Sequence, residues 1–264
     1  MRVAFADSLS CLPLRLGLEA TGGLDGVELV GGTYDEADAA LLSGEVELGL
    51  VSSAGWARNR EALWRVPGYG IASDGPAMNT LLAVREGRTL REARSVALTG
   101  DTGTGQVLAR ILLERVYRAT PRYEVVSAAP AWVLAEHDAA LLTGDAAFEA
   151  RRLGGVETID LGEAWREYAG LPMVYAVWAS RKDPAKYGFW ADRVAVAVVW
   201  AEGHTDEVVA EARRRGIPAT DEDLRAYFSS AIGYRVGLRE GEGLKRYLSE
   251  GGLSADGFYG KASA

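Results

Sequence analysis

Four short turns rich in small and hydroxyl-bearing residues constrain this chain more than any other feature. Each turn follows an apolar run typical of a strand and precedes an apolar pattern typical of a helix. A helix start presents unpaired backbone N–H groups and the positive end of the helix dipole. Several helix starts facing one cleft would therefore bind a small molecule that carries carboxylates. The turns are Asp7-Ser-Leu-Ser-Cys-Leu-Pro13, Val51-Ser-Ser-Ala54, Thr99-Gly-Asp-Thr-Gly-Thr-Gly105 and Thr143-Gly-Asp145.

The net charge limits the partners that the chain can bind. Its 264 residues carry a formal charge of −8 and contain no block of like charges. Nucleic-acid binding needs a basic surface, so we expect no nucleic-acid partner. The overall field would oppose an anionic ligand, and its attraction must come from backbone dipoles and a few Arg or Lys residues.

Cysteine and histidine are too scarce for disulfide or metal chemistry. Cys11 is the single cysteine, and the two histidines, His137 and His204, lack the spacing of a metal site. Gly103 and Gly105 lack the third glycine of a dinucleotide-binding turn. We therefore expect no metal and no organic cofactor. Neither a signal peptide nor an apolar stretch of about 18 residues is visible, which predicts a cytoplasmic protein without a membrane partner.

Apolar and amphipathic runs alternate as far as about residue 180, which predicts an α/β fold with parallel strands and helices on both faces. Beyond that point the pattern is helical. The expected strands are 3–6, 27–30, 48–51, 69–72, 80–84, 96–99, 123–126, 140–142 and 174–179. The expected helices are 12–20, 34–42, 54–61, 106–117, 146–152, 162–169, 184–202, 206–215, 222–232 and 240–249.

The order of these elements predicts two lobes. The block from about 85 to 178 has its own alternation of strands and helices, and the first block and the helical tail flank it. We expect residues 1–84 with 180–264 to form one discontinuous lobe and residues 85–179 to form the other. A cleft between two such lobes is a common place for a small-molecule site.

Motifs along nearly the whole chain carry a family resemblance. The most specific are Ser73-Asp-Gly-Pro76 and Asp160-Leu-Gly-Glu-Ala-Trp165. Others are Leu41-Leu-Ser-Gly-Glu-Val46, Ala57-Arg58-Asn59, Val96-Ala-Leu-Thr99, Leu141-Leu-Thr-Gly-Asp145, Gly170-Leu-Pro172, Ala176-Val-Trp178 and Tyr227 with Tyr234 and Gly243-Leu244. Together they resemble the chorismate dehydratases of the futalosine route to menaquinone. The resemblance implies a two-lobed fold of the type II periplasmic-binding-protein class, with a central inter-lobe cleft and a helical C-terminal region.

The resemblance also implies a reaction and a set of site residues. The activity would be that of a lyase, which dehydrates chorismate, a small dicarboxylate, to 3-[(1-carboxyvinyl)oxy]benzoate without a cofactor. Because no protein base is evident, we expect the proton to pass to a carboxylate of the substrate. The catalytic candidates are Ser10 and Asn79. The substrate-binding candidates are Ser52, Ser53, Ser73, Thr102, Gly103, Thr104, Gly105, Gly144 and Asp145, with one carboxylate on the amides around 102–105.

Departures from the family pattern keep two other functions open. The family usually has Asn where this chain has Ser10 and Ser where it has Asn79, and its Ser/Thr-x-Thr-Ser turn ends here in Gly105. These changes also fit a non-catalytic protein that binds small carboxylates on the same fold. A third possibility is the sister enzyme that forms dihydroxynaphthoate, although its Cys-Pro-Asn type of opening turn is missing here.

Each candidate has a purely structural alternative. Thr102 with Thr104, Ser52 with Ser53, Ser10 and Asp145 could simply cap the helices that follow them. Ser73 precedes an Asp-Gly-Pro turn, and Cys11 could be a small buried apolar residue rather than a reactive thiolate. The sequence predicts no oligomeric state.

Overall fold

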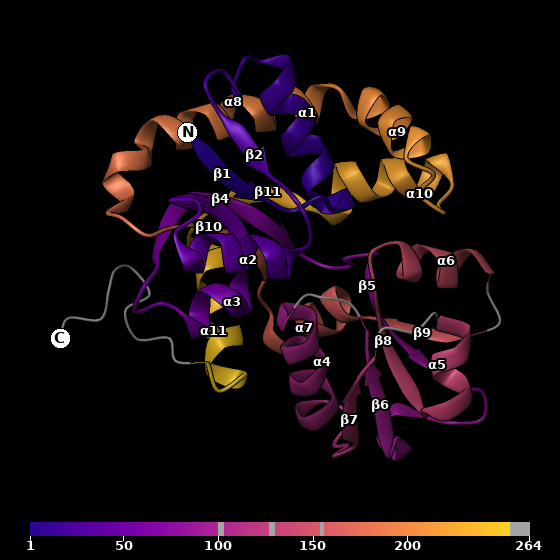
Figure 1. The fold of residues 1–264 in the computed structure, drawn as a ribbon. Helices are drawn as coiled ribbons and strands as arrows, with labels where there is room; N and C mark the ends of the chain where they lie inside the picture. The colour runs from indigo at the N-terminus through magenta and orange to yellow at the C-terminus, as the bar shows by residue number, and fades with distance from the viewer. Residues whose placement is uncertain (100–102, 127–129, 154–155, 254–264) are drawn as a thin grey trace.

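The computed structural model divides the chain into two α/β bodies, each built around one sheet (Figure 1). It describes residues 1–99, 103–126, 130–153 and 156–253, without the side chains of 130–132 and 153. The chain passes between the two sheets at residues 74–79 and again at residues 161–172. We call these segments the first and the second crossover.

The larger sheet holds six strands, which come from both the N-terminal and the C-terminal parts of the chain. Its strands are β1 (Arg2–Phe5), β2 (Glu28–Val30), β3 (Leu48–Ser52), β4 (Trp64–Ser73), β10 (Met173–Ser180) and β11 (Gly233–Val236). They lie in the order β11-β4-β10-β3-β1-β2. β1 pairs in parallel with β2 and β3, whereas β10 runs antiparallel to β3 and β4, and β11 antiparallel to β4.

The smaller sheet holds five strands, which come from the middle of the chain. They are β5 (Thr80–Val84), β6 (Ser95–Leu98), β7 (Arg122–Val125), β8 (Ala139–Thr143) and β9 (Glu157–Asp160), in the order β7-β6-β8-β5-β9. β6 pairs in parallel with β7 and β8, and β5 runs antiparallel to β8 and β9.

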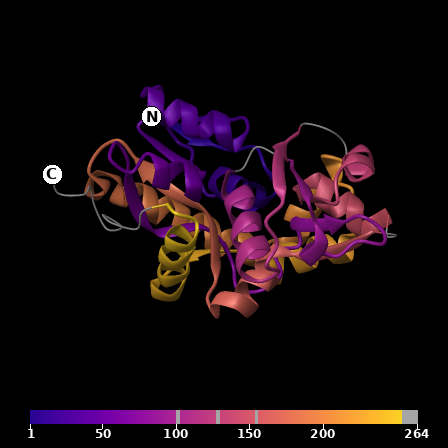
Figure 2. The ribbon, with the colours of Figure 1, turned by 90° about the horizontal axis from the view of Figure 1, so that it is seen from below.

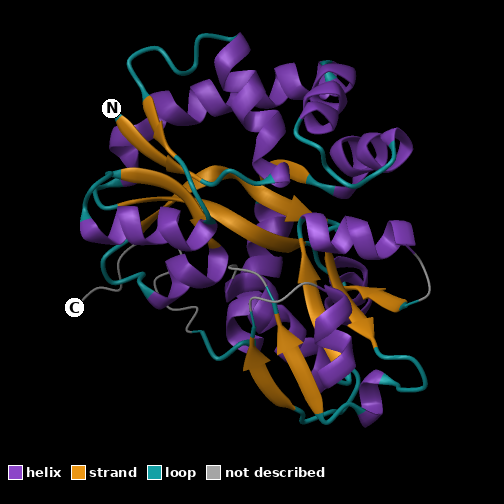
Figure 3. Ribbon diagram, turned by 45° about the vertical axis from the view of Figure 1, so that its right-hand side comes forward, coloured by secondary structure: helices purple, strands orange, loops and turns teal. Residues whose placement is uncertain are grey.

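Helices flank both sheets (Figure 3). They are α1 (Leu12–Ala20), α2 (Tyr34–Ser43), α3 (Ser53–Arg58), α4 (Gly103–Arg115), α5 (Pro130–Glu136), α6 (Asp145–Leu153), α7 (Leu161–Ala169), α8 (Gly188–Gly203), α9 (Thr205–Arg214), α10 (Asp221–Ala226) and α11 (Leu238–Glu250). Short 3₁₀ turns cover Leu9–Cys11, Leu90–Glu92 and Pro184–Tyr187, and a π turn covers Tyr227–Ala231. Figure 2, seen from below, shows α11 in yellow on the underside of the molecule.

Local sequence explains where several helices begin and end. Thr33 and Glu36 form a capping box at the start of α2, and Gly44 ends that helix with a left-handed φ of 83°. Asp160 caps α7 through its own carboxylate, which accepts from the amides of Gly162 and Glu163. These signals can be read from the sequence, and both helices lie within one residue of their expected bounds.

The two-lobed α/β architecture expected from the sequence is confirmed, but the strands differ in detail. Residues 80–84 were expected in the lobe of both chain ends, but β5 pairs in the smaller sheet. Residues 174–179 were expected in the middle lobe, but β10 pairs in the larger sheet. β5 and β10 each enter their sheet directly from the other body. Neither therefore needs the crossover helix that connects parallel neighbouring strands. Both run antiparallel, and the sheets are mixed rather than parallel. The sequence analysis also missed β9 and β11, and the tail is therefore not entirely helical.

The helix α1 packs backbone to backbone against α8. A Cβ atom at Gly17 would lie 2.3 Å from the carbonyl oxygen of Ala197, so only glycine permits this approach. Leu14 and Leu18 on α1 and Trp190 and Val198 on α8 are buried in the same core. This core positions the N-terminal turn that follows β1.

We predict that Gly17→Ala lowers the free energy of unfolding by about 1–3 kcal/mol, because the added methyl forces the two helices apart. Urea denaturation followed by circular dichroism measures the change. Gly203→Ala, at the open end of α8 with no atom within 4 Å of the new Cβ, is the matched control. Equal losses in the two variants would contradict the packing described here.

Candidate functional site

A cavity of about 790 Å³ lies between the two bodies. Its lining comes from the turn after β1, the start of α2, the ends of β3 and β4, the first crossover with the start of β5, α4, the turn before α6, β10, and the tail. The lining residues are Ala6, Asp7, Ser8, Leu9, Ser10, Gly32, Thr33, Tyr34, Glu36, Ser52, Ile71, Asn79, Thr80, Thr104, Thr143, Gly144, Asp145, Tyr175, Arg215, Ile217, Tyr227 and Ile232. All four turns singled out in the sequence contribute to it.

The structure brings some of the predicted site residues together and leaves others out. Those that line the cavity are Ser10, Ser52, Asn79, Thr104, Gly144 and Asp145. Ser53, Ser73, Gly103 and Gly105 are not among the lining residues. Thr102 lies outside the described residues.

Ser10 belongs to a cluster of hydroxyl groups. Its Oγ lies 2.9 Å from Ser8 Oγ and 3.4 Å from Tyr34 Oη, and its carbonyl accepts a hydrogen bond from Tyr234 at 2.9 Å. Tyr34 Oη also lies 3.4 Å from Cys11 Sγ. Burial raises the pKa of Cys11 and that of Tyr34, so both groups stay protonated. Cys11 is therefore a buried thiol and not an activated thiolate.

Asn79 faces the cavity from the first crossover. Its side-chain amide donates to the Tyr227 hydroxyl at 2.8 Å, and its side-chain oxygen accepts from Thr80 at 3.2 Å. Burial raises the pKa of Tyr227, which keeps this phenol neutral. The phenol accepts from Asn79, so its own proton is available for another acceptor in the cavity.

Asp160 fixes the loop that carries Asn79. Its carboxylate accepts hydrogen bonds from the backbone amides of Ala77 at 2.8 Å and Met78 at 2.7 Å, while it also caps α7. Met78 has a positive φ of 62°, a conformation that needs such support in a residue other than glycine. A Cβ at Gly162 would lie 2.5 Å from the carbonyl oxygen of Gly75, so the two crossovers touch. The two most specific sequence motifs therefore touch at Gly75 and Gly162, and the Asp160 carboxylate holds the two residues that directly follow Pro76.

Side chains of the protein itself occupy the start of α3. Ser52 accepts from the Gly55 amide at 2.9 Å and donates to Asp38 at 2.7 Å, so its hydroxyl has no proton left for a ligand. Thr104 Oγ1 accepts from the Ala54 amide at 3.0 Å and keeps its own proton. Ser53 is buried and donates to the carbonyl of Val174 at 2.8 Å. Ser52 thus caps α3, as its structural alternative expects, whereas the Ser53 hydroxyl bonds to β10 instead.

Ser73 and Asp145, two of the remaining candidates, differ in how far the protein's own hydrogen bonds engage their side chains. Ser73 is buried and donates to Tyr175 Oη at 3.4 Å, so it reaches the cavity only through that phenol. Asp145 is exposed at the first turn of α6 and has no recorded hydrogen bond within the described chain. Partial burial raises the pKa of Asp145.

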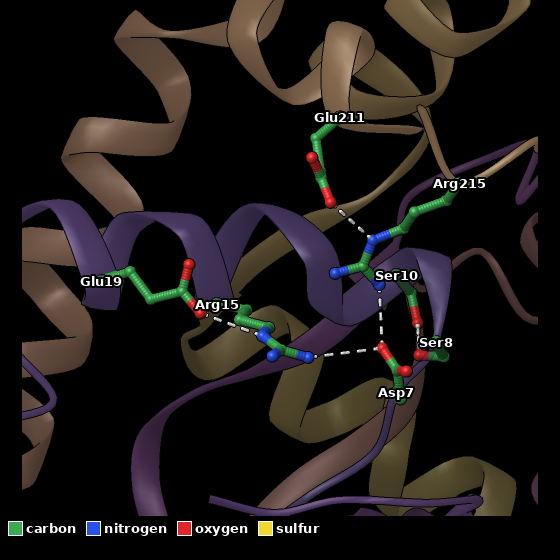
Figure 4. Close-up of polar contacts among 7 residues, drawn as sticks. All are labelled: Asp7, Ser8, Ser10, Arg15, Glu19, Glu211 and Arg215. Carbon is green, nitrogen blue, oxygen red and sulfur yellow. Dashed lines mark hydrogen bonds and ion pairs between the residues drawn. The ribbon is translucent and has the colours of Figure 1, made fainter. Parts of the chain in front are cut away.

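Arg215, Glu211 and Asp38 are charged residues of the site region that did not emerge from the sequence analysis. Arg215 directly follows α9; its Nη1 donates to Asp7 at 2.8 Å and its Nε to Glu211 at 3.0 Å (Figure 4). The third is Asp38, whose carboxylate accepts from the backbone amide of Ser52 at 3.0 Å. A basic run at 213–215 before Gly216 marks the end of α9, but nothing in that run indicates which arginine faces the cavity.

Comparison with known proteins places the chain in a family. A family model described as menaquinone biosynthesis matches residues 1–252. The chain belongs to the menaquinone-biosynthesis family. It is 32% identical to the chorismate dehydratase of Thermus thermophilus over 74% of this chain and 76% of that protein. It is 26% identical to the 1,4-dihydroxy-6-naphtoate synthase of the same organism over 76% of this chain and 74% of that protein.

The fold of this family member is shared with binding proteins. The periplasmic aliphatic sulphonate binding protein SsuA from Escherichia coli superposes with a TM-score of 0.68 at 12% identity, covering 99% of this chain and 90% of that one. Among the described residues no group of three or more His, Cys, Asp or Glu side chains could hold a metal ion. No helix of the described chain is long and apolar enough to cross a membrane.

We predict a pH-dependent effect of Asp38→Asn. Burial raises the pKa of Asp38 in the folded state from 3.8 to about 6. The folded chain therefore holds this proton more tightly than the unfolded chain does. The contribution of the proton to the free energy of unfolding is largest at low pH and is lost as the pH rises through about 6. The free energy of unfolding of the natural chain, minus that of the variant, should fall by on the order of 2 kcal/mol between about pH 4 and about pH 7.

Denaturation at a series of pH values measures this difference. Asp192→Asn, which removes an exposed carboxylate from α8, is the control. A difference that stays constant or rises across the range would contradict the assignment.

Proposed function

We propose that the chain is a lyase that removes water from chorismate to give 3-[(1-carboxyvinyl)oxy]benzoate. The observation that carries this proposal is the 32% identity to a chorismate dehydratase over most of both chains. The hydroxyl-rich cavity supports it, because the reaction calls for oriented donors rather than for a strong base. The cytoplasm as its location, and the absence of a metal or organic cofactor, are part of the proposal.

The chemistry asks little more of the protein than orientation. The bond between the ring and its hydroxyl group breaks, and the hydroxyl leaves. A neighbouring ring carbon loses its proton, and the ring becomes aromatic. Aromatisation supplies the driving force. Ser10 and Asn79 would hold and polarise the departing hydroxyl, and Thr104, whose hydroxyl lines the cavity, would donate to a substrate carboxylate. The proton would pass to a carboxylate of the substrate, with Asp145 as the alternative acceptor from the protein.

Incubation of the purified chain with chorismate tests the proposal. Chromatography with absorbance detection should show chorismate replaced by the enolpyruvyl benzoate. Tight binding with unchanged chorismate would instead support a non-catalytic binding protein on the same fold.

One observation favours the sister activity as a second candidate. A cavity of about 790 Å³ is larger than a single ring with a short side arm fills, and the sister enzyme uses a bulkier cyclic substrate derived from futalosine. Formation of dihydroxynaphthoate from that substrate, without loss of chorismate in a parallel reaction, would favour this candidate.

We predict that Ser10→Ala lowers kcat about 10- to 100-fold, because one donor to the departing hydroxyl is lost. The fold should be kept, since the hydroxyl bonds to other side-chain hydroxyls, those of Ser8 and Tyr34 among them. Initial rates and thermal unfolding measure the two effects. Ser229→Ala, which removes an exposed hydroxyl bonded to the Arg225 carbonyl, is the control. Equal kcat in both variants would give the turn after β1 a purely structural role.

A further inference from the structure

The lining of the cavity carries more negative than positive charge. Its described acidic residues are Asp7, Glu36 and Asp145, and among the described lining residues Arg215 alone is basic. Glu36 is engaged in the capping box of α2, where it accepts from the Thr33 amide at 2.7 Å. An anion that enters the cavity therefore meets one attractive formal charge, that of Arg215.

Acidic partners hold the Arg215 guanidinium along two of its edges. Nε is bonded to Glu211 and Nη1 to Asp7, and Arg15 in turn holds Asp7 from the other side at 3.6 Å. Figure 4 shows the third nitrogen of the guanidinium turned away from both carboxylates, with no interaction drawn to it. A guanidinium has five N–H donors in a rigid fork. Two hydrogen bonds therefore leave donors that can bond to another carboxylate.

The position of this guanidinium fits a role in ligand binding. Figure 4 shows the Ser8 and Ser10 hydroxyls beside the Asp7–Arg215 pair. The side chain of Arg215 is 29% exposed, so it is shielded enough to strengthen a charged hydrogen bond and open enough to reach one. Its neighbour Arg214 pairs with the same Glu211 at 2.6 Å, but it is 75% exposed and does not line the cavity.

We propose that Arg215 binds a carboxylate of the ligand, with Asp7 and Glu211 holding its guanidinium in place. This assignment rests on the proposed function, whose substrate carries two carboxylates. The Thr104 hydroxyl would receive one of them, and Arg215 supplies the formal charge for the other. The cavity thereby selects dianions although the chain as a whole is acidic.

A matched pair of probes tests the assignment by equilibrium binding to the full chain. The dicarboxylate 3-(carboxymethoxy)benzoate mimics the expected product, and 3-methoxybenzoate lacks its second carboxylate. Arg215→Gln should weaken binding of the dicarboxylate about 10- to 100-fold, the usual effect of losing one charged hydrogen bond. Arg215→Lys should restore part of the affinity, and Arg214→Gln should bind as the natural chain does.

The two probes separate the outcomes. Loss for the dicarboxylate alone assigns Arg215 to the side-arm carboxylate, and equal loss for both probes with rescue by lysine assigns it to the ring carboxylate. Equal loss without rescue, unchanged affinity for the dicarboxylate in Arg215→Gln, or no binding of it by the natural chain would each overturn the proposal. Turnover of chorismate by the natural chain is measured separately. If turnover fails, the binding measurements alone still decide whether Arg215 binds a carboxylate.

Discussion

The Asp160 carboxylate is the contact on which the geometry between the two sheets depends. It accepts the amides of Ala77 and Met78 from the first crossover and those of Gly162 and Glu163 from the second. Four hydrogen bonds to one carboxylate fix both crossovers in one place. Asn79 follows Met78 directly, and its carbonyl accepts the Gly144 amide at 2.9 Å. The same contact therefore positions the crossover and the turn before α6 against each other.

Helix dipoles contribute less to anion binding in the cavity than the pattern of turns suggests. Two of the first amides of α3 are already bonded to Ser52 and Thr104 instead of facing a ligand, and the bond from Ala54 to Thr104 joins the two bodies. The turn before α6 offers Asp145, an acid, which would repel a carboxylate. Attraction for an anion thus falls to hydroxyl groups and to one guanidinium, which the acids around it orient.

The sequence predicts the elements of this fold better than their arrangement. The apolar run 80–84 has the bounds of β5 to the residue, because local composition decides that a strand forms. Which sheet the strand joins depends on the crossovers, and no local signal carries that information. β9 was missed because Glu157–Asp160 has only one strongly apolar residue, Ile159.

The same distinction holds for the candidate site. Ser10 and Thr104 were predicted because helix starts are visible as small-residue turns. Ser53 belongs to an equally good turn, but the strand β10 beside it takes its hydroxyl, and only tertiary packing shows this. Arg215 lies at the end of a helix in a run of three arginines, where the spacing cannot tell a cavity-facing side chain from a solvated one.

Burial gives the hydroxyl cluster a definite chemical character. It raises the pKa of Tyr34, Tyr227 and Tyr175, so these phenols remain protonated donors at neutral pH and cannot act as bases. A site of fixed neutral donors stabilises a departing hydroxide and does little to remove a proton from carbon. Such a site suits a reaction in which the formation of an aromatic ring makes the proton easy to lose. The phenols then need no basic partner for the proton, because the substrate brings its own carboxylates and Asp145 is the alternative acceptor.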